Sequence, residues 1–448
     1  MLMFVSMLAQ AQPVVLSEEV PTIRERVDTL DATRCEAVLQ GVFDELAPLR
    51  PDQVDLADAS EHGEALVDAL FASRVALQSQ LTAFHHAGTL TPGCISGARR
   101  FDLAVRYLTD HFYLAGTDHD AWVGTPGFGG PEDLRAGDIL VTRGAGLSSA
   151  GIAHIGQLDS QFSHNAMVHV DAEGRVWTVE AYLERGALVQ PLDRFLEHGL
   201  GRIAVIRFED PELAARGAAL AYDRVATGPA IDYDEAFDSS SADELFCSEI
   251  GPWAIGLAGG PTDLPLHRTR FPRSTNPAMF DAMGIDADDL AAPVDLLLDP
   301  RFTLVAEWRA VEHLEDMRRQ DAVVESVFTW MERDGYTLEA RWADRATVDV
   351  GLAVRRTPVL GRALASRVHP HGDRGFLVAG LAMQQAGEAV YTELNARLDP
   401  VGYTSREEML TLLERIRAED LATWHATPRK ARFHRNLHPA DDGVAAQD

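Results

Sequence analysis

A histidine, His164, and a glutamate, Glu180, are the first residues of this chain whose types and spacing could do chemistry. His164 opens the first of two short runs rich in Val, Met, Trp and Thr, and Glu180 lies near the end of the second. The turn residues Asp171–Gly174 separate the runs, so the pattern predicts a β-hairpin. If Val170 pairs with Gly174 across a three-residue loop, His164 lies directly opposite Glu180 on one face. A carboxylate beside an imidazole stabilises the imidazolium, as a general base requires.

The nucleophile that this pair lacks is expected at Cys247. It is one of three cysteines, and the only one that lies among polar residues suited to a helix start, in the segment LFCSEI. A helix N-terminus and a nearby imidazolium can lower the pKa of a thiol from ~8.5 towards roughly 3.5–7.5. Taken alone, each residue fits a structural role better: His164 as a hydrogen-bonded residue at a strand end, Glu180 as a solvated carboxylate and Cys247 as a small buried side chain. Together they suggest a Cys-His-Glu triad.

The length and charge of the chain limit the classes of partner. Its 448 residues allow two or three domains, and its formal net charge is −29. Such a chain repels nucleic acid and anionic membrane surfaces, so nucleic acid is excluded as a partner and small, neutral or cationic substrates stay open. No later stretch reaches the roughly 18 uncharged apolar residues of a membrane span. No cofactor or metal is expected, because Pro and Gly in the segment HPHGD (369–373) favour a turn over a metal site.

The N-terminus leaves two compartments open. Residues 1–8 are apolar and precede Ala9-Gln10-Ala11, which is typical of the end of a secretory signal peptide, although the run is short and lacks a basic start. A periplasmic or secreted protein is therefore one expectation, and a cytoplasmic protein with an apolar tail over residues 1–19 is the other. In an exported protein Cys35 and Cys94 could form a disulfide, whereas in the cytosol both would stay reduced.

Apolar spacing and breakers divide the chain into successive regions. After residues 1–19 we expect a helical region and a Gly- and Pro-rich linker at 20–130, a mixed core at 131–275 and a mainly helical region at 276–448. In the core, strands at 139–141, 188–192 and 203–208 and helices at 147–158 and 212–227 should accompany the hairpin. Beyond the core, Leu304, Trp308, Val311 and Leu314 predict a helix.

The order of motifs resembles that of the permuted papain-like cysteine hydrolases of the NlpC superfamily, the YaeF/YiiX group. The resemblance covers roughly residues 134–256. Its motifs are a GDIL strand start, Ser163-His164, Val179-Glu180-Ala181, Tyr233-Asp234 and Phe246-Cys247-Ser248-Glu249. In that group the His strand precedes the Cys helix, and Cys, His and an acidic or polar residue form the triad. The resemblance therefore implies Cys247, His164 and Glu180 as catalytic residues, on an α+β core of a small antiparallel sheet plus helices, flanked by helical regions.

The implied activity is hydrolysis of an amide bond of peptide, aminoacyl or γ-glutamyl type through an acyl-enzyme. Because related permuted enzymes act on lipids, a lipid-directed acyltransferase or thioesterase is an alternative, so the expected partner is a small-molecule, peptide or lipid-amide substrate. A degenerate binding protein whose helical flanks carry the function is a second alternative. It rests on two departures from the family pattern: Phe246 stands where a Tyr is usual, and Gly251-Pro252 interrupts the helix expected after Cys247.

Overall fold

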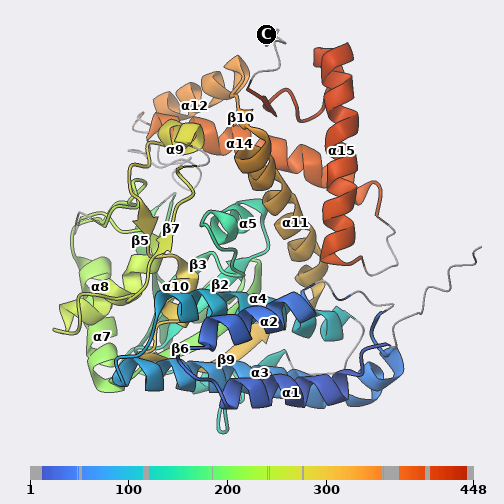
Figure 1. The fold of residues 1–448 in the computed structure, drawn as a ribbon. Helices are drawn as coiled ribbons and strands as arrows, with labels where there is room; N and C mark the ends of the chain where they lie inside the picture. The colour runs from blue at the N-terminus through green and yellow to red at the C-terminus, as the bar shows by residue number, and fades with distance from the viewer. Residues whose placement is uncertain are drawn as a thin grey trace, which may run out of the picture.

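A seven-stranded antiparallel sheet organises the molecule (Figure 1). Its strand order is β1-β9-β6-β2-β3-β4-β5. The strands are β1 (Trp122–Gly124), β2 (Ile139–Gly144), β3 (His164–Val170), β4 (Val176–Tyr182), β5 (Gly186–Pro191), β6 (Leu200–Phe208) and β9 (Phe302–Arg309). Two small sheets pair β7 (Thr269–Arg270) with β8 (Asp289–Leu290) and β10 (Tyr336–Leu338) with β11 (Leu437–Pro439).

The computed structural model describes residues 13–440 apart from 48, 50–52, 115–120, 184, 240, 242, 275–276, 356, 358–372 and 399–403. The expected signal-peptide pattern, which ends at Ala11, lies outside the described residues. Residues 369–372 of the HPHGD segment also lie outside them.

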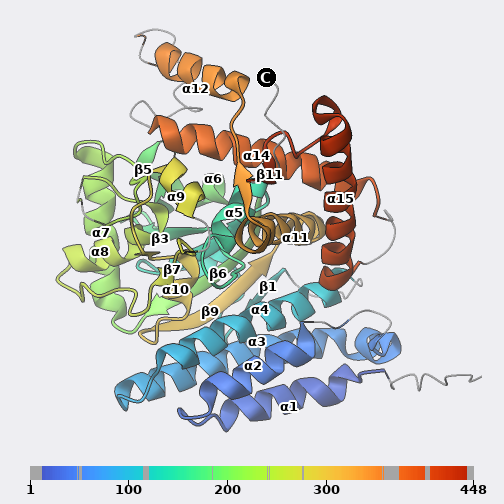
Figure 2. The same cartoon turned by 45° about the horizontal axis from the view of Figure 1, so that its top comes forward.

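Helices from both ends of the chain flank the sheet, as expected for this α+β fold. Figure 2 shows four N-terminal helices side by side: α1 (Leu16–Asp28), α2 (Cys35–Leu46), α3 (Leu56–His86) and α4 (Pro92–Leu114). The long helices of the C-terminal region are α11 (Val311–Asp334), α12 (Trp342–Arg355), α14 (Arg374–Asn395) and α15 (Arg406–Ala426). Between them along the chain are α5 (Leu147–His154), α6 (Leu192–Leu196), α7 (Pro211–Thr227), α8 (Ile250–Leu257), α9 (Pro277–Met283) and α10 (Pro293–Leu297).

The expected hairpin forms from β3 and β4, but its predicted register is wrong. Val170 pairs with Val176, and the Asp171 N–H donates to the carbonyl of Arg175 at 3.0 Å. The three-residue loop therefore ends at Gly174, whose φ of +78° suits the last position of such a loop and not a strand. This shift moves every partner by two residues, which leaves each side chain on its face. His164 and Glu180 consequently stay on the same face as diagonal neighbours.

The helix expected over residues 304–314 is also wrong in its first part. Residues 302–309 form β9, which lies between β1 and β6, and helix α11 begins only at Val311. Most of β9 is buried, and a buried strand cannot be separated from a buried helix by apolar spacing alone. Residues 122–124 of the expected linker pair with β9 as β1. The sheet thus takes one strand from each side of the expected 131–275 core.

Buried ion pairs join the N-terminal helices to this sheet. Asp110 on α4 accepts hydrogen bonds from Arg202 on β6, at 2.5 Å, and from Arg309 on β9, at 3.2 Å. Glu307 on β9 pairs with Arg106 on α4 at 2.7 Å. These side chains are at most 1% exposed, and breaking a buried pair typically costs about 3–5 kcal/mol. The pairs therefore hold α4 in one position on the sheet.

A disulfide between Cys35 and Cys94 joins α2 to α4. Replacing both cysteines by Ser should lower the free energy of unfolding by about 4 kcal/mol, because the bridge closes a loop across a separation of 59 residues in the unfolded chain. Urea unfolding followed by circular dichroism measures this change, and the parent protein with its disulfide reduced is the comparison that opens the bridge without a substitution. Three free thiols in the denatured, unreduced parent protein would contradict the disulfide.

Candidate active site

Cys247 begins a short 3-10 turn, η3 (Cys247–Glu249), directly before α8. Glu249 caps this turn, because its Oε2 accepts the Phe246 N–H at 3.1 Å. The expected helix start at Cys247 is thus a turn, and α8 begins at Ile250. Pro252 then falls in the first turn of α8, where an N–H has no intrahelical acceptor and proline is tolerated.

Gly251 has a packing role in the same segment. A Cβ at this position would lie 2.5 Å from Cδ1 of Ile139 on β2. The glycine therefore lets the start of α8 approach the sheet closely. Gly251 and Pro252 are therefore both compatible with a helix that packs closely on the sheet. The Gly251-Pro252 sequence no longer supports the alternative of a degenerate binding protein.

The structure brings Cys247, His164 and Glu180 together. His164 starts β3, and its Nε2 lies 2.9 Å from Oε2 of Glu180 on β4. Because Glu180 occupies Nε2, Nδ1 of His164 is the ring nitrogen left for the thiol. Sγ of Cys247 lies 3.8 Å from the carbonyl oxygen of Ser163, the residue before His164, and the Cys247 and His164 side chains shift each other's pKa. The ring of Tyr182 stacks on the imidazole, with centroids 4.8 Å apart.

Glu180 is itself held in place within the sheet. It is fully buried, and its second oxygen accepts hydrogen bonds from the Thr178 hydroxyl at 3.0 Å and from the Gln190 amide. Both carboxylate oxygens are therefore engaged, which fixes the direction in which the carboxylate meets His164. A residue that orients an imidazole needs this kind of support.

The charges of the pair move the pKa values of both partners. Burial lowers the pKa of His164, but the hydrogen bonds and negative charges of Cys247 and Glu180 outweigh it and raise that pKa above its usual range. Burial raises the pKa of Cys247, but the hydrogen bond and charge of His164 outweigh it and lower that pKa, with help from the Ser248 hydroxyl and the Asn165 N–H. Both shifts favour a thiolate–imidazolium pair at neutral pH.

Tyr233 is a further residue of the site, and sequence reasoning gave it no role. Burial raises the pKa of its hydroxyl well above the usual range, and the neighbouring Cys247 contributes to that shift. The loop after it is pinned by Asp234, whose carboxylate accepts the N–H groups of Ala236 and Phe237 at 2.9 and 3.0 Å. Tyr233-Asp234 was visible as a motif, but only the fold shows that the hydroxyl reaches Cys247.

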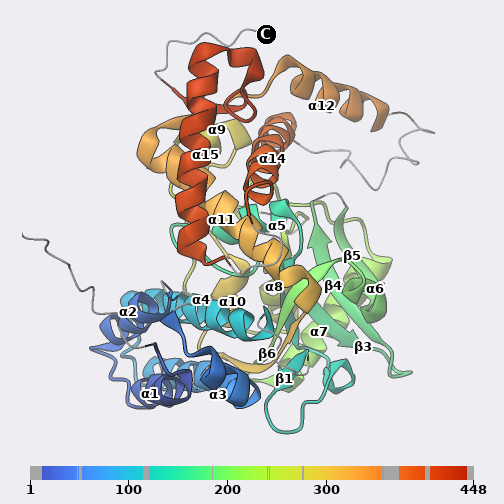
Figure 3. The same ribbon diagram turned by 90° about the vertical axis from the view of Figure 1, so that its right-hand side faces the viewer.

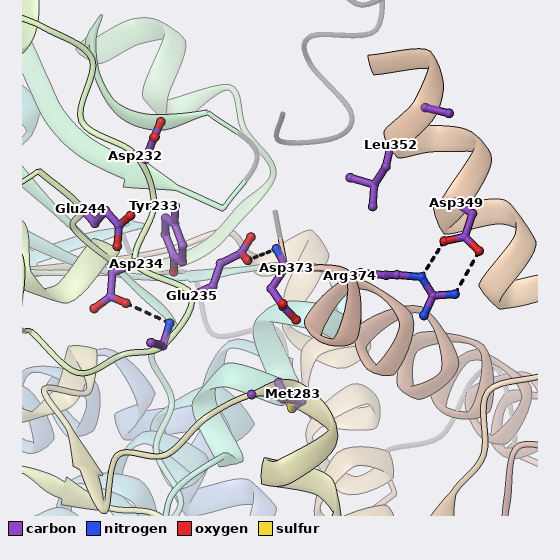
Figure 4. A pocket seen from close by; sticks show the side chains of 13 residues that line it. Asp232, Tyr233, Asp234, Glu235, Glu244, Met283, Asp349, Leu352, Asp373 and Arg374 are labelled. Carbon is purple, nitrogen blue, oxygen red and sulfur yellow. Dashed lines mark hydrogen bonds and ion pairs between the residues drawn. The ribbon is translucent and has the colours of Figure 1, made fainter. Parts of the chain in front are cut away.

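Tyr233 also lines a cavity of about 640 Å³ (Figure 4). Six carboxylates share the wall: Asp232, Asp234, Glu235, Glu244, Asp349 and Asp373. The single arginine in the wall, Arg374, is paired with Asp349 at 2.6 Å. Burial and the neighbouring Asp373, Glu244 and Asp234 raise the pKa of Glu235 to about 7. The cavity therefore carries an excess of negative charge.

Within the described part of the chain, no group of three or more His, Cys, Asp or Glu side chains is arranged to hold a metal ion. No described helix is both long and apolar enough to cross a membrane.

The family resemblance is confirmed by comparison with known protein families. Residues 133–250 match the family model Peptidase_C92, described as permuted papain-like amidase enzymes, YaeF/YiiX. This stretch contains His164, Glu180, Tyr233 and Cys247, and it spans β2 to β6 of the sheet. Comparisons with curated proteins and with solved structures gave no match. Residues 133–250, about a quarter of the chain, are therefore similar to the permuted papain-like amidases of the YaeF/YiiX group, and the antiparallel sheet agrees with that match.

Proposed function

We propose that the protein is a cysteine amidase that uses Cys247, His164 and Glu180 as its triad. The thiolate of Cys247 attacks the carbonyl carbon of an amide, and the imidazolium of His164 gives its proton to the nitrogen as the C–N bond breaks. Water, deprotonated by His164, then hydrolyses the thioester and restores the thiolate–imidazolium pair. Glu180 orients the imidazole throughout. The observation that carries this proposal is the continuous contact Cys247–His164–Glu180, with pKa shifts that favour the ion pair.

The oxyanion of the intermediate would lie beside two donors. The Cys247 backbone N–H is one, and the hydroxyl of Tyr233, whose pKa responds to Cys247, is the other. The raised pKa of Tyr233 keeps its proton in place for donation. Tyr233 thus supplies a hydroxyl next to the nucleophile even though Phe246, which precedes Cys247, has none.

The acidic cavity favours a substrate that carries positive charge. Its six carboxylates would repel a phosphate or a free carboxylate, and they outnumber the apolar side chains of the wall, which are Ala236, Met283, Leu352 and Ala353. We therefore place an amide of a cationic compound, such as a peptide or aminoacyl group with a free amine, ahead of a lipid substrate.

The disulfide bears on the compartment in which the protein acts. We propose that the protein acts in the periplasm or is secreted, because the disulfide between Cys35 and Cys94 would persist only in an oxidising environment. Cys247 is then the single free thiol of the chain.

Iodoacetamide should modify native Cys247 rapidly at mildly acidic pH, because His164 lowers the pKa of the thiol and the thiolate persists until the pH falls through that lowered value. In His164→Ala the positive partner is lost while burial still raises the pKa, so the apparent pKa should climb above ~8.5. Peptide mass spectrometry measures the rate against pH, with urea-denatured protein as the ordinary-thiol control. If the rate of Cys247 modification depended on pH in the same way in parent and variant, the proposed ion pair would be contradicted.

Among matched aminoacyl p-nitroanilides, we expect the Lys compound to be hydrolysed with a kcat/KM at least about tenfold above that of the Glu compound, because the cavity wall is negatively charged. The double variant Asp232→Asn, Glu244→Gln should narrow this ratio. The absorbance of released p-nitroaniline, followed at low and at high salt, measures the hydrolysis of both compounds and so their ratio of kcat/KM. A preference for the Glu compound would contradict the assignment of substrate charge.

Tyr233→Phe should lower kcat roughly 100- to 1,000-fold, the usual cost of an oxyanion donor, and leave KM almost unchanged. Steady-state kinetics on the best substrate measures both constants. Tyr222→Phe is the matched control, because its ring stacks on His169 and lies outside the triad. A kcat equal to that of the parent would remove Tyr233 from the mechanism.

A further inference from the structure

Residues around the start of α12 and the end of α15 line a second cavity, of about 470 Å³. Figure 3 shows these two helix ends near each other. It belongs to the C-terminal helical region, outside the stretch that matches the amidase family. Its wall includes four arginines and two tryptophans: Arg341, Arg345, Arg429, Arg435, Trp342 and Trp424. Such a wall is opposite in charge to the cavity beside Tyr233.

Three of the four arginines in this wall lack a carboxylate partner among the described residues. Arg341 is engaged by Asp344 and Gln385. Arg345, Arg429 and Arg435 have no carboxylate partner in the part of the chain that the structure describes. The one carboxylate of the wall, Glu339, is 3.1 Å from Nε2 of His438 and is thus already paired.

The acidity of the chain makes this cluster unusual. Acidic residues outnumber Lys and Arg by 69 to 40, so carboxylate partners are plentiful elsewhere on the molecule. Guanidinium groups that surround one cavity repel each other, and an anion between them relieves that repulsion. Guanidinium groups also match the geometry of carboxylate and phosphate oxygens better than other side chains do.

The tryptophans add a flat apolar surface. Trp342 is 67% exposed, whereas Trp424 is only 3% exposed and stacks on His438. The indole N–H of Trp424 has no hydrogen-bond partner within the described residues. An exposed aromatic face and a buried unpaired donor at one cavity are features of a ligand site.

We propose that this cavity binds a small organic oxyanion, that is, a carboxylate or phosphate carried on a planar or apolar group. Arg345, Arg429 and Arg435 hold the oxyanion, and Trp342 contacts the planar part. The volume lies within the range of roughly 300–1,000 Å³ typical of small-molecule sites and exceeds what inorganic phosphate would fill. The site does not depend on the proposed amidase activity, since it shares no residue with the triad.

Isothermal titration calorimetry on the full chain tests the proposal with phenyl phosphate and benzoate as probes and with inorganic phosphate and benzylamine as comparisons. We expect saturable binding of at least one aromatic anion, weaker binding of inorganic phosphate and none of benzylamine; the tighter of the two anions identifies the oxyanion. The double variant Arg429→Gln, Arg435→Gln should weaken binding about tenfold or more, through loss of charge-assisted hydrogen bonds. Arg216→Gln, an exposed arginine on α7, is the matched control and should change nothing.

Trp342→Ala is the second variant, because it keeps the arginines and alters an exposed position that folding does not require. It should weaken phenyl phosphate binding selectively over inorganic phosphate, while circular dichroism confirms that all variants fold. The proposal is overturned if neither aromatic anion binds, if benzylamine binds equally well, or if the double arginine variant keeps the parent affinity. Inorganic phosphate bound as tightly as phenyl phosphate also overturns it, because the site would then respond to charge alone.

Discussion

The proposed ion pair between the Cys247 thiolate and the His164 imidazolium is the interaction on which the candidate active site depends. Burying two charges costs several kcal/mol per ion unless they are paired and hydrogen-bonded. Here the pair is completed by Glu180, whose oxygens are engaged by His164, Thr178 and Gln190. The negative charge of Glu180, like that of the thiolate, stabilises the positive charge of the His164 imidazolium. Removing His164 would therefore leave two negative charges among buried side chains, whereas removing Cys247 or Glu180 would leave His164 with a single negative partner.

Holding this contact requires elements that are distant in the chain. β3 supplies the histidine, β4 supplies the carboxylate and η3 supplies the thiol. Contacts with other parts of the fold hold these elements in place. Glu249 caps the turn that carries Cys247, and Gly251 lets α8 lie close to Ile139 on β2. The sheet extends past the matched residues to β1 and β9, and buried ion pairs tie it to α4. The helical flanks are therefore built into the support of the site.

The sequence predicted much of this site because hairpin geometry has a period of two. His164 and Glu180 were placed on one face from their spacing, and the error in register preserved that face, since Gly174 shifted the pairing by two residues. The strand at 302–309 could not be recognised, because a strand buried on most of its length has the same apolar spacing as a buried helix. Tyr233 and the acidic cavity were missed for another reason: they depend on contacts between segments far apart in the chain.

Nuclear magnetic resonance of ¹⁵N-histidine-labelled protein tests the central claim most directly, with the His164 signal assigned among the 16 histidines by comparison with His164→Gln. The account predicts that both ring nitrogens of His164 are protonated at pH 7 in the parent. It also predicts that the pKa of His164 falls in Cys247→Ser, where the negative thiolate is absent. A neutral His164 with one protonated nitrogen at pH 7 in the parent would contradict the ion pair on which the proposed mechanism rests.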